Sequence, residues 1–571
     1  MHAIRNDHSS IRRFSGLLRP YTRQLLVAVA ALVCLAGVNM TFPLFIKLLI
    51  DDIFPNDDRL LLCLTLLGLV LFYAARNVLY FHSKTTSVEV GENVSFNLRN
   101  ALFERLQQMN LQFYRTTKPG QISSRVMDDS FVIQTFIQDQ FPKLLLGVFM
   151  FLGLVASLYA VNWQLALAST VVLPLHLLVF RWFQRTMKDS SRAAQEQLSI
   201  VHGNLIEKFL GVEVVKGFTG EQRESEAFLM ATDRSRVSQL RSKSYHVRQK
   251  IVGDLLVGIG TIALLGFGAY QVMGPPQMEG GTFFMFFGWV GMLYPTVLIL
   301  MNGLAQLTKC TASIDRVYDM LETGEAEDET HGTVFKPIRG HIVFDSVCFG
   351  YGDGTPVLRN VKFEVKPGQV CAFVGPSGSG KSTLVGLVPR LLEPDLGRVF
   401  IDGLDVAKIN LHYLREHIGI AFQECFLFNS SILENLQYAN PNVTMPQIVE
   451  VARRTGAHRF ITKLAHGYET VIGDAGVSLS RGEKQRINLT RAMLKNPKIL
   501  ILDEATGSID VHSESQILPA ILDFMRGKTT LMITHRPELL KHADKVVALD
   551  EGRVVYEGAP EGATASEGFG V

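Results

Sequence analysis

The chain has 571 residues, of which 47% are hydrophobic and only 19% are charged, and its formal net charge is +2. With a mean hydropathy of +0.19, it is too apolar for a purely soluble protein, so membrane spans are expected. The length allows at least two domains, and the near-neutral charge gives no reason to expect a nucleic-acid partner.

The amino-terminal 24 residues are polar and basic, and the apolar run that follows them is too long for a cleavable signal peptide. Six apolar runs are long enough to cross a bilayer as helices. These runs are Leu25–Ile46, about Leu60–Phe81, Leu144–Val161, Leu165–Phe180, Ile251–Met273 and Thr282–Leu304. Arginines precede the first run and aspartates follow it, so the positive-inside rule places the amino terminus in the cytoplasm.

Two inner segments, about 82–143 and 181–250, are polar but keep helical periodicity. Because long structureless loops are uncommon, we expect helices that extend well past the bilayer into the cytosol. Each hairpin has a turn-like tip, near Phe113–Gln121 and near Phe209–Thr219. These tips could contact a cytoplasmic domain and carry force to the membrane.

Two charged residues, Arg76 and Asp254, fall inside predicted spans. Intramembrane charges usually face a cavity or a partner. Arg76 is a candidate for a substrate cavity, with a wet vestibule or snorkelling as the alternative. Asp254 is interpreted as lying at the cytoplasmic edge.

The segment Gly375-Pro-Ser-Gly-Ser-Gly-Lys-Ser-Thr383 follows an apolar strand, Val370–Val374, and opens a predicted helix. Strand, glycine-rich turn and helix form the context of a phosphate-binding loop. The backbone N–H groups and the helix N-terminus would hold phosphates, and Lys381 would reach the β- and γ-phosphates. The residues predicted to hold ATP here are Gly375, Ser377, Gly378, Ser379, Gly380, Lys381, Ser382 and Thr383.

Two acids, Asp503 and Glu504, end a second apolar strand that begins at Lys498. Asp503, Ser382 and a water shell suit Mg²⁺, while Glu504 can polarise the attacking water as a general base. A third apolar run, Thr530–Thr534, ends at His535, whose side chain could contact a γ-phosphate.

These motifs, in this order, resemble those of ABC exporter half-transporters, including lipid A flippases and multidrug exporters, over about residues 10–560. The resemblance implies that Tyr351 stacks on adenine and that Gln423 meets both Mg²⁺ and the membrane domain. It also implies that Ser480 and Gly482, in the signature segment Leu479–Glu483, act on the ATP of a partner chain. The D-loop residue is Asp510, and the implied catalytic group is Glu504, His535, Lys381 and Gln423.

The implied architecture is an all-α membrane domain of six helices with long cytoplasmic extensions, fused to an α/β P-loop ATPase. We predict an amino-terminal segment (1–24), a six-span domain (25–321), a linker (322–338) and the ATPase domain (339–571). Such a protein is expected in the bacterial inner membrane, with its amino terminus and ATPase domain in the cytoplasm. ATP and Mg²⁺ are the implied cofactors.

The signature departs from the family pattern, because Arg481 replaces a glycine and Glu483 replaces a glutamine. Ala475 also stands where exporters usually have arginine. A homodimer is the favoured interpretation, and a heterodimer with a complementary half-transporter stays open. The different classes left open are an ATP-gated regulatory subunit and an importer subunit. The favoured substrate is a lipid or glycolipid, because Arg76 aligns with a cavity arginine of lipid A flippases and other exporters; multidrug export is the alternative.

Overall fold

The computed structural model describes residues 3–274, 278–322, 327, 335–352, 355–473, 476–505 and 511–561. The chain divides into two compact units. The first contains Met1–Phe103 and Ser123–Glu322, and the second contains Glu104–Ile122 together with Thr323–Val571. The tip of the first cytoplasmic hairpin therefore groups with the carboxy-terminal half of the sequence.

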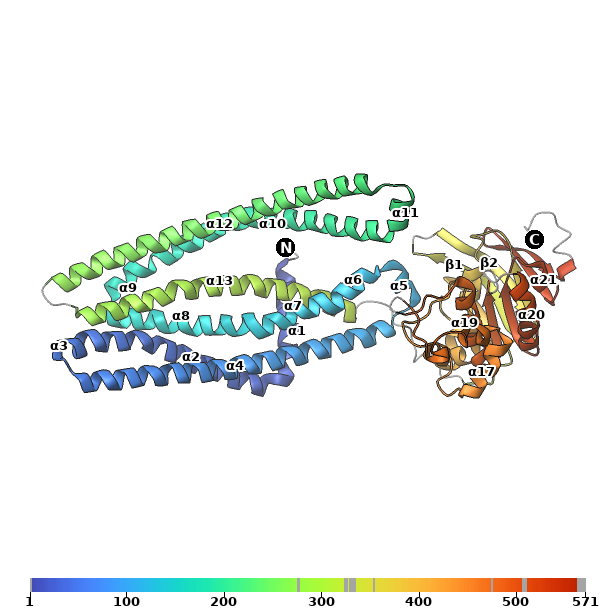
Figure 1. Ribbon diagram of the computed structural model, residues 1–571, viewed down its shortest axis with the longest axis horizontal. Helices are drawn as coiled ribbons and strands as arrows, with labels where there is room; N and C mark the ends of the chain where they lie inside the picture. Colours follow the sequence, from blue (N-terminus) through green and yellow to red (C-terminus); the bar gives the residue numbers. More distant parts are fainter. Residues whose placement is uncertain are drawn as a thin grey trace. The chain divides into compact units, whose positions relative to one another are not determined.

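The described residues of the first unit form helices joined by short turns (Figure 1). The long helices are α2 (Thr22–Leu48), α4 (Arg59–Gln107), α8 (Phe141–Val161), α10 (Val172–Leu210), α12 (Glu221–Met273) and α13 (Gly280–Glu322). The short helices are α1 (Ala3–Leu18), α3 (Phe54–Asn56), α7 (Ser130–Thr135), α9 (Trp163–Thr170) and α11 (Val212–Gly217). Helix α6 (Pro119–Ser124) begins in the second unit and ends in the first. Short 3-10 or π-helical turns are η1 (Arg19–Tyr21), η2 (Leu49–Ile53), η3 (Arg125–Asp129) and η4 (Phe136–Gln140).

Six helical stretches in the described residues are long and apolar enough to span a membrane, which confirms the six predicted spans. The helices also continue far beyond the apolar runs. Helix α12 has 53 residues, a length of about 80 Å at 1.5 Å per residue. Because the hydrocarbon core of a bilayer is only about 30 Å thick, the predicted cytoplasmic extensions are confirmed as well.

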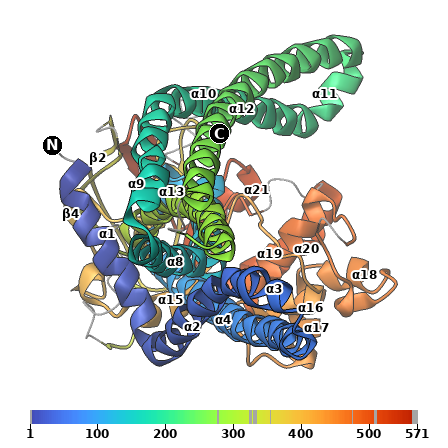
Figure 2. The ribbon, with the colours of Figure 1, turned by 90° about the vertical axis from the view of Figure 1, so that its left-hand side faces the viewer.

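Helix α13 lies at the centre of this unit. In the most apolar part of α13, 50% of the residues are buried, whereas in the corresponding part of α4 only 11% are buried. Phe286 and Leu293 of α13 share a core cluster with Leu154 of α8. Helices α10 and α12 lie side by side and diverge from the other long helices towards α11 (Figures 1 and 2). The apolar side chains left exposed on the outer helices suit contact with lipid.

Polar contacts fasten the cytoplasmic parts of these helices to one another. Ser10 of α1 donates to Asp315 of α13 at 2.7 Å, and Arg13 donates to Glu322 at 2.6 Å. The amino-terminal helix is therefore tied to the end of α13.

The second unit contains two sheets. Their strands are β1 (Ile342–Tyr351), β2 (Thr355–Val365), β3 (Val370–Val374), β4 (Leu396–Ile401), β5 (Leu404–Asp405), β6 (Ile418–Ala421), β7 (Ile499–Asp503), β8 (Thr529–Ile533), β9 (Lys545–Asp550) and β10 (Arg553–Gly558). The larger sheet has the order β10-β9-β3-β8-β7-β6, and its strands from β9 to β6 are parallel. Strands buried on both faces require continuous apolar runs, which is the pattern that the sequence shows at β3, β7 and β8.

Helices surround these sheets. They are α5 (Leu111–Thr116), α14 (Lys381–Leu387), α15 (Leu411–Glu416), α16 (Ile432–Gln437), α17 (Met445–Arg454), α18 (Ala457–Ile461), α19 (Arg481–Leu494), α20 (Val511–Met525) and α21 (Pro537–Leu540), with the 3-10 turns η5 (Val406–Lys408) and η6 (Gly467–Glu469). Helices α16 to α19 share a core of their own that includes Ile432, Ile448 and Ile487. Leu111 of α5 packs against the core that lies between the two sheets.

Candidate ATP-hydrolysis site

Four neighbouring strands of the larger sheet bring the predicted catalytic segments together. The order β3-β8-β7-β6 is parallel throughout, so the carboxyl ends of these strands share one edge. The glycine-rich loop follows β3, Asp503 ends β7, and Gln423 and His535 each lie two residues beyond β6 and β8. Residues far apart in the sequence thus meet at one edge of the sheet.

The glycine-rich loop needs glycine for steric reasons. Gly375 has φ +140°, and a Cβ atom there would lie 2.0 Å from the carbonyl oxygen of Leu549. Gly380 has φ +97°, and its Cβ would lie 2.8 Å from Leu358 Cδ2. Helix α14 begins immediately afterwards, at Lys381. The loop therefore leads directly into a helix N-terminus, the arrangement that favours phosphate.

The Lys381 side chain folds back onto this loop. Its Nζ donates to the carbonyl oxygens of Gly375 and Pro376, at 2.8 Å in each case. Burial lowers the pKa of Lys381, and the nearby carboxylates of Glu504 and Asp503 oppose that shift. A phosphate would give this buried cation an anionic partner in place of two neutral carbonyl groups.

Asp503 and Ser382 form a donor set that suits a magnesium ion. Asp503 is buried, and its Oδ1 has no hydrogen-bond partner among the residues that the structure describes. Burial raises the pKa of Asp503, and a hydrogen bond from Ser382 partly offsets this rise. Mg²⁺ is usually bound through one or two protein oxygens together with substrate phosphates. The unpartnered carboxylate oxygen beside a hydroxyl fits that requirement.

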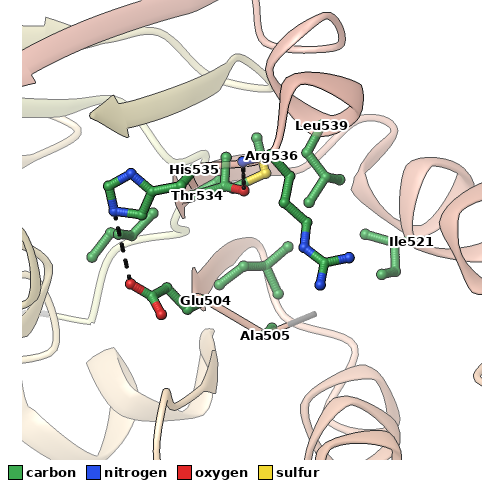
Figure 3. A pocket seen from close by; sticks show the side chains of 10 residues that line it. Glu504, Ala505, Ile521, Thr534, His535, Arg536 and Leu539 are labelled. Carbon is green, nitrogen blue, oxygen red and sulfur yellow. Dashed lines mark hydrogen bonds and ion pairs between the residues drawn. The ribbon is translucent and has the colours of Figure 1, made fainter. Parts of the chain in front are cut away.

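Glu504 lies beside two of the other predicted site residues. Gln423 Nε2 donates to Glu504 Oε2 at 3.0 Å, and His535 Nε2 lies 4.0 Å from Glu504 Oε1. Figure 3 shows Glu504 and His535 facing each other at a cavity of about 230 Å³ that Ile521 and Leu539 also line. Glu504 has φ 47°, an unfavourable conformation for a residue with a Cβ that is often found at functional sites.

Tyr351 is anchored at the end of β1. Its hydroxyl bonds Thr383 Oγ1 at 2.8 Å, which ties the ring to helix α14. Phe349 meets the ring edge-on, with the ring centroids 4.9 Å apart. Arg115 of α5 places its Cζ over the ring, 4.7 Å from the centroid. No sequence signal identifies Arg115, because an arginine in a polar tip has no pattern that specifies its partner.

The signature segment forms a capping box at the start of α19. Ser480 Oγ accepts from the backbone N–H of Glu483 at 3.3 Å, and the Glu483 carboxylate accepts from the backbone N–H of Ser480 at 2.9 Å. The Ser480 hydroxyl also donates to Glu483 Oε2 at 2.7 Å. The spacing S-x-x-E is a known sequence signal for this cap, so this role of Glu483 was open to prediction but was missed. Gly482 is half-buried in the first turn of α19.

Two charged residues singled out in the sequence lie away from this site. Arg76 is exposed on α4, and so is Asp254 on α12. Asp510 of the D-loop falls outside the described residues, as does Ala475.

Comparison with known proteins identifies the family. Two family models match the chain: "ABC transporter transmembrane region" over residues 25–294 and "ABC transporter" over residues 358–507. The ATP-dependent lipid A-core flippase of Syntrophus aciditrophicus is 33% identical over 98% of this chain and 92% of its own length. The chain belongs to the ABC transporter family.

Other relatives agree with this assignment. A putative multidrug export ATP-binding/permease protein of Bacillus subtilis is 30% identical over 96% of both chains. The structure of a bacterial Atm1-family ABC exporter with ATP bound matches with a TM-score of 0.82, covering 96% of this chain and 97% of the other at 24% identity. The predicted fold of a six-helix membrane domain followed by an α/β ATPase is confirmed.

This ABC transporter is thus an ATP-hydrolysing exporter of the half-transporter type. It is a multi-pass protein of the bacterial inner membrane, and its ATPase domain is cytoplasmic. ATP binding follows from the ATPase domain, and half-transporters of this family generally work as dimers.

Proposed function

We propose that this exporter moves an amphipathic lipid with an anionic group, most simply a glycolipid, across the inner membrane by alternating access of a homodimer. The observation that carries the substrate class is Arg76. Two relatives named as lipid A-core flippases, at 33% and 30% identity, support the same choice.

Arg76 is a cation with no neutralising neighbour in a membrane-spanning helix. It is exposed on α4, and within the described part of the chain it has no hydrogen-bond or ion-pair partner. Tyr73, Leu79 and Tyr80 lie three or four residues from Arg76, on the same face of the helix, and are exposed or half-buried. A charge placed in hydrocarbon costs at least about 2.5 kcal/mol. This face of α4 is therefore better suited to a water-filled cavity, where an anionic headgroup would pair with Arg76 while acyl chains contact the apolar neighbours.

The ATPase residues take the following roles in the proposal. Lys381 and the loop amides hold the β- and γ-phosphates, and Glu504 accepts the proton of the attacking water. Gln423 orients the Glu504 carboxylate, and His535 contacts the γ-phosphate. The remaining nucleotide contacts are Tyr351, Thr383 and, from the partner chain, the signature residues and Asp510. Mg²⁺, held by Asp503 and Ser382, neutralises charge on the phosphates when it is bound.

A homodimer is the proposed assembly, in which each signature acts on the ATP of the partner chain. Ser480 keeps a small side chain and Gly482 has none, which allows that close approach. Arg481 adds a cation and Glu483 adds an acid at the same surface, so their charges offset each other. A heterodimer with a complementary half-transporter is the alternative that these two substitutions favour.

Multidrug export is the second candidate function. Relatives named as putative multidrug exporters match at 30% identity, and the apolar surroundings of Arg76 would also accept a hydrophobic drug. The two candidates differ in the charge that they require, because a cationic drug gains nothing from Arg76.

The chain purified alone in lipid nanodiscs provides the test. We expect Mg²⁺-dependent ATP hydrolysis by a particle containing two 63.5 kDa chains, stimulated by an anionic glycolipid. Arg76→Ala should abolish this stimulation and Arg76→Lys should preserve it. Arg185→Ala, which removes an exposed arginine of α10 outside the predicted spans, is the control.

Different outcomes would contradict different parts of the proposal. Stimulation by cationic drugs that survives Arg76→Ala would favour multidrug export. A monomer, or a dimer that binds ATP without turnover, would favour a missing partner chain or a gating role.

A further inference from the structure

A cavity in the second unit joins the first cytoplasmic tip to the predicted adenine site. It has a volume of about 450 Å³. Its lining residues are Gln112, Arg115, Thr116, Phe349, Tyr351, Gly352 and Leu392. Both sides of this cavity belong to the same compact unit, and Leu111 anchors α5 against the core of that unit.

The Tyr351 ring is held in place and already covered. Its hydroxyl is tied to Thr383, and Phe349 meets the ring edge-on. Arg115 covers the ring with its Cζ 4.7 Å from the centroid. Arg115 itself has no carboxylate partner among the described residues, so the ring is the interaction that holds its guanidinium.

An aromatic base cannot enter between Arg115 and Tyr351 in this arrangement. Non-bonded layers pack at about 3.5 to 4.0 Å, so a base inserted between the guanidinium and the ring would need a separation of about 7 Å or more. The observed 4.7 Å leaves no room for that layer. Stacking of a base on this face of Tyr351 therefore requires Arg115 to leave.

We propose that Arg115 and the base of the bound nucleotide compete for the same face of Tyr351. The proposal rests on the nucleotide site assigned above. Nucleotide binding breaks the contact that Arg115 makes between α5 and the ATPase domain. Binding coupling is reciprocal, so any movement that withdraws α5 from Tyr351 raises nucleotide affinity. Arg115 thus acts as a positioning residue that links the tip to occupancy of the base site.

The test compares a ligand that has a base with one that lacks it. The dissociation constants of ADP and of inorganic pyrophosphate are measured by calorimetry on the full chain in nanodiscs. Removing Arg115 also removes a positive charge, which affects both ligands, so the informative quantity is the ratio of the two affinities. We expect Arg115→Ala to raise the ratio of ADP affinity to pyrophosphate affinity by about two- to fivefold, the range for an exposed cation–π contact.

Two controls isolate the contact. Gln112→Ala changes the lining of the same cavity without touching the ring contact, so the ratio should stay at the wild-type value. In a Tyr351→Ala background the additional Arg115→Ala substitution should have no effect on the ratio, because the shared ring is gone.

A ratio that falls in Arg115→Ala would overturn the proposal, since Arg115 would then support the base. An unchanged ratio would overturn it as well. Either result, obtained with a wild-type chain that hydrolyses MgATP, would leave the proposed transport function intact. If the wild-type chain did not hydrolyse MgATP but Arg115→Ala raised the ratio, the proposed transport function would be contradicted. The competition between Arg115 and the base would still be supported.

Discussion

Replacing Glu504 by glutamine should stop steady-state ATP hydrolysis and leave nucleotide binding in place. The glutamine side chain has the same length and can still accept the hydrogen bond from Gln423, which is 3.0 Å long in the native chain. Both residues carry a Cβ, so the conformational cost of φ 47° at this position is unchanged. The amide cannot accept a proton from water, so only the chemical step should suffer.

The size of the effect follows from the role. A positioned general base contributes about 100- to 10,000-fold to rate, and each factor of ten corresponds to about 1.36 kcal/mol of activation free energy. We therefore expect turnover to fall by two to four orders of magnitude, about 2.7 to 5.4 kcal/mol. His535 lies 4.0 Å from the Glu504 carboxylate, which is too far for a strong hydrogen bond. Removing the charge of Glu504 therefore changes the interactions of His535 little and adds little to the loss of turnover.

The assay is phosphate release from MgATP at saturation in nanodiscs, with ATP binding measured in parallel. Glu551→Gln is the matched control, because Glu551 is an exposed glutamate of the same unit with φ 45°. Turnover within tenfold of the wild-type rate would refute the base assignment. Simultaneous loss of binding would refute the claim that the site geometry survives the substitution.

Three further substitutions test the rest of the site. Gly375→Ala should lower the melting temperature of the ATPase domain and abolish ATP binding, because the new methyl group collides with a backbone carbonyl. Gly378→Ala also places a side chain at positive φ, +83°, but meets open space, so it should cost less; equal losses would contradict the steric argument. Tyr351→Ala should weaken ADP binding and leave kcat at saturation unchanged. The loss of binding free energy should be smaller than the about 1–3 kcal/mol of a base–aromatic stack, because Arg115 competes for the ring. An unaltered ADP affinity would mean that the ring only packs. Glu483→Gln should raise ATPase activity, most at low salt, because it removes a negative charge beside the hydroxyl of Ser480; activity that is equal at all salt concentrations would place Glu483 away from the partner's phosphates.

The spans and the core strands were predictable because their signals are local. A strand buried on both faces must be apolar throughout, and β3 at Val370–Val374 shows that pattern directly. The loop after it was equally clear, because Gly375 and Gly380 stand where positive φ and close contacts exclude other residues. Parallel strands then place the two acids at the end of β7 on the same edge.

Contacts between distant segments could not be read from the sequence. Arg115 and Tyr351 belong to different halves of the chain, and neither one carries a pattern that specifies the other. The same is true of Arg415, which makes a bidentate ion pair with Glu327 at 2.7 and 2.9 Å. The backbone N–H of Glu327 in turn donates to Gln108 at 2.6 Å. These contacts depend on how the first tip folds against the ATPase domain, which periodicity alone does not determine.

Several predicted ATP contacts already have partners within the chain. Lys381 is bonded to its own loop, Glu504 to Gln423, the Ser480 hydroxyl to its own capping box, and the Tyr351 ring is covered by an arginine. ATP must replace these partners, so part of its interaction free energy is used to break them, and the apparent affinity is reduced accordingly. The phosphate loop, the Q-loop and the first tip would be released by the ATP that this chain holds, and the signature helix by the ATP of the partner chain. We therefore expect nucleotide binding itself, before any hydrolysis, to release the contact of α5 with Tyr351.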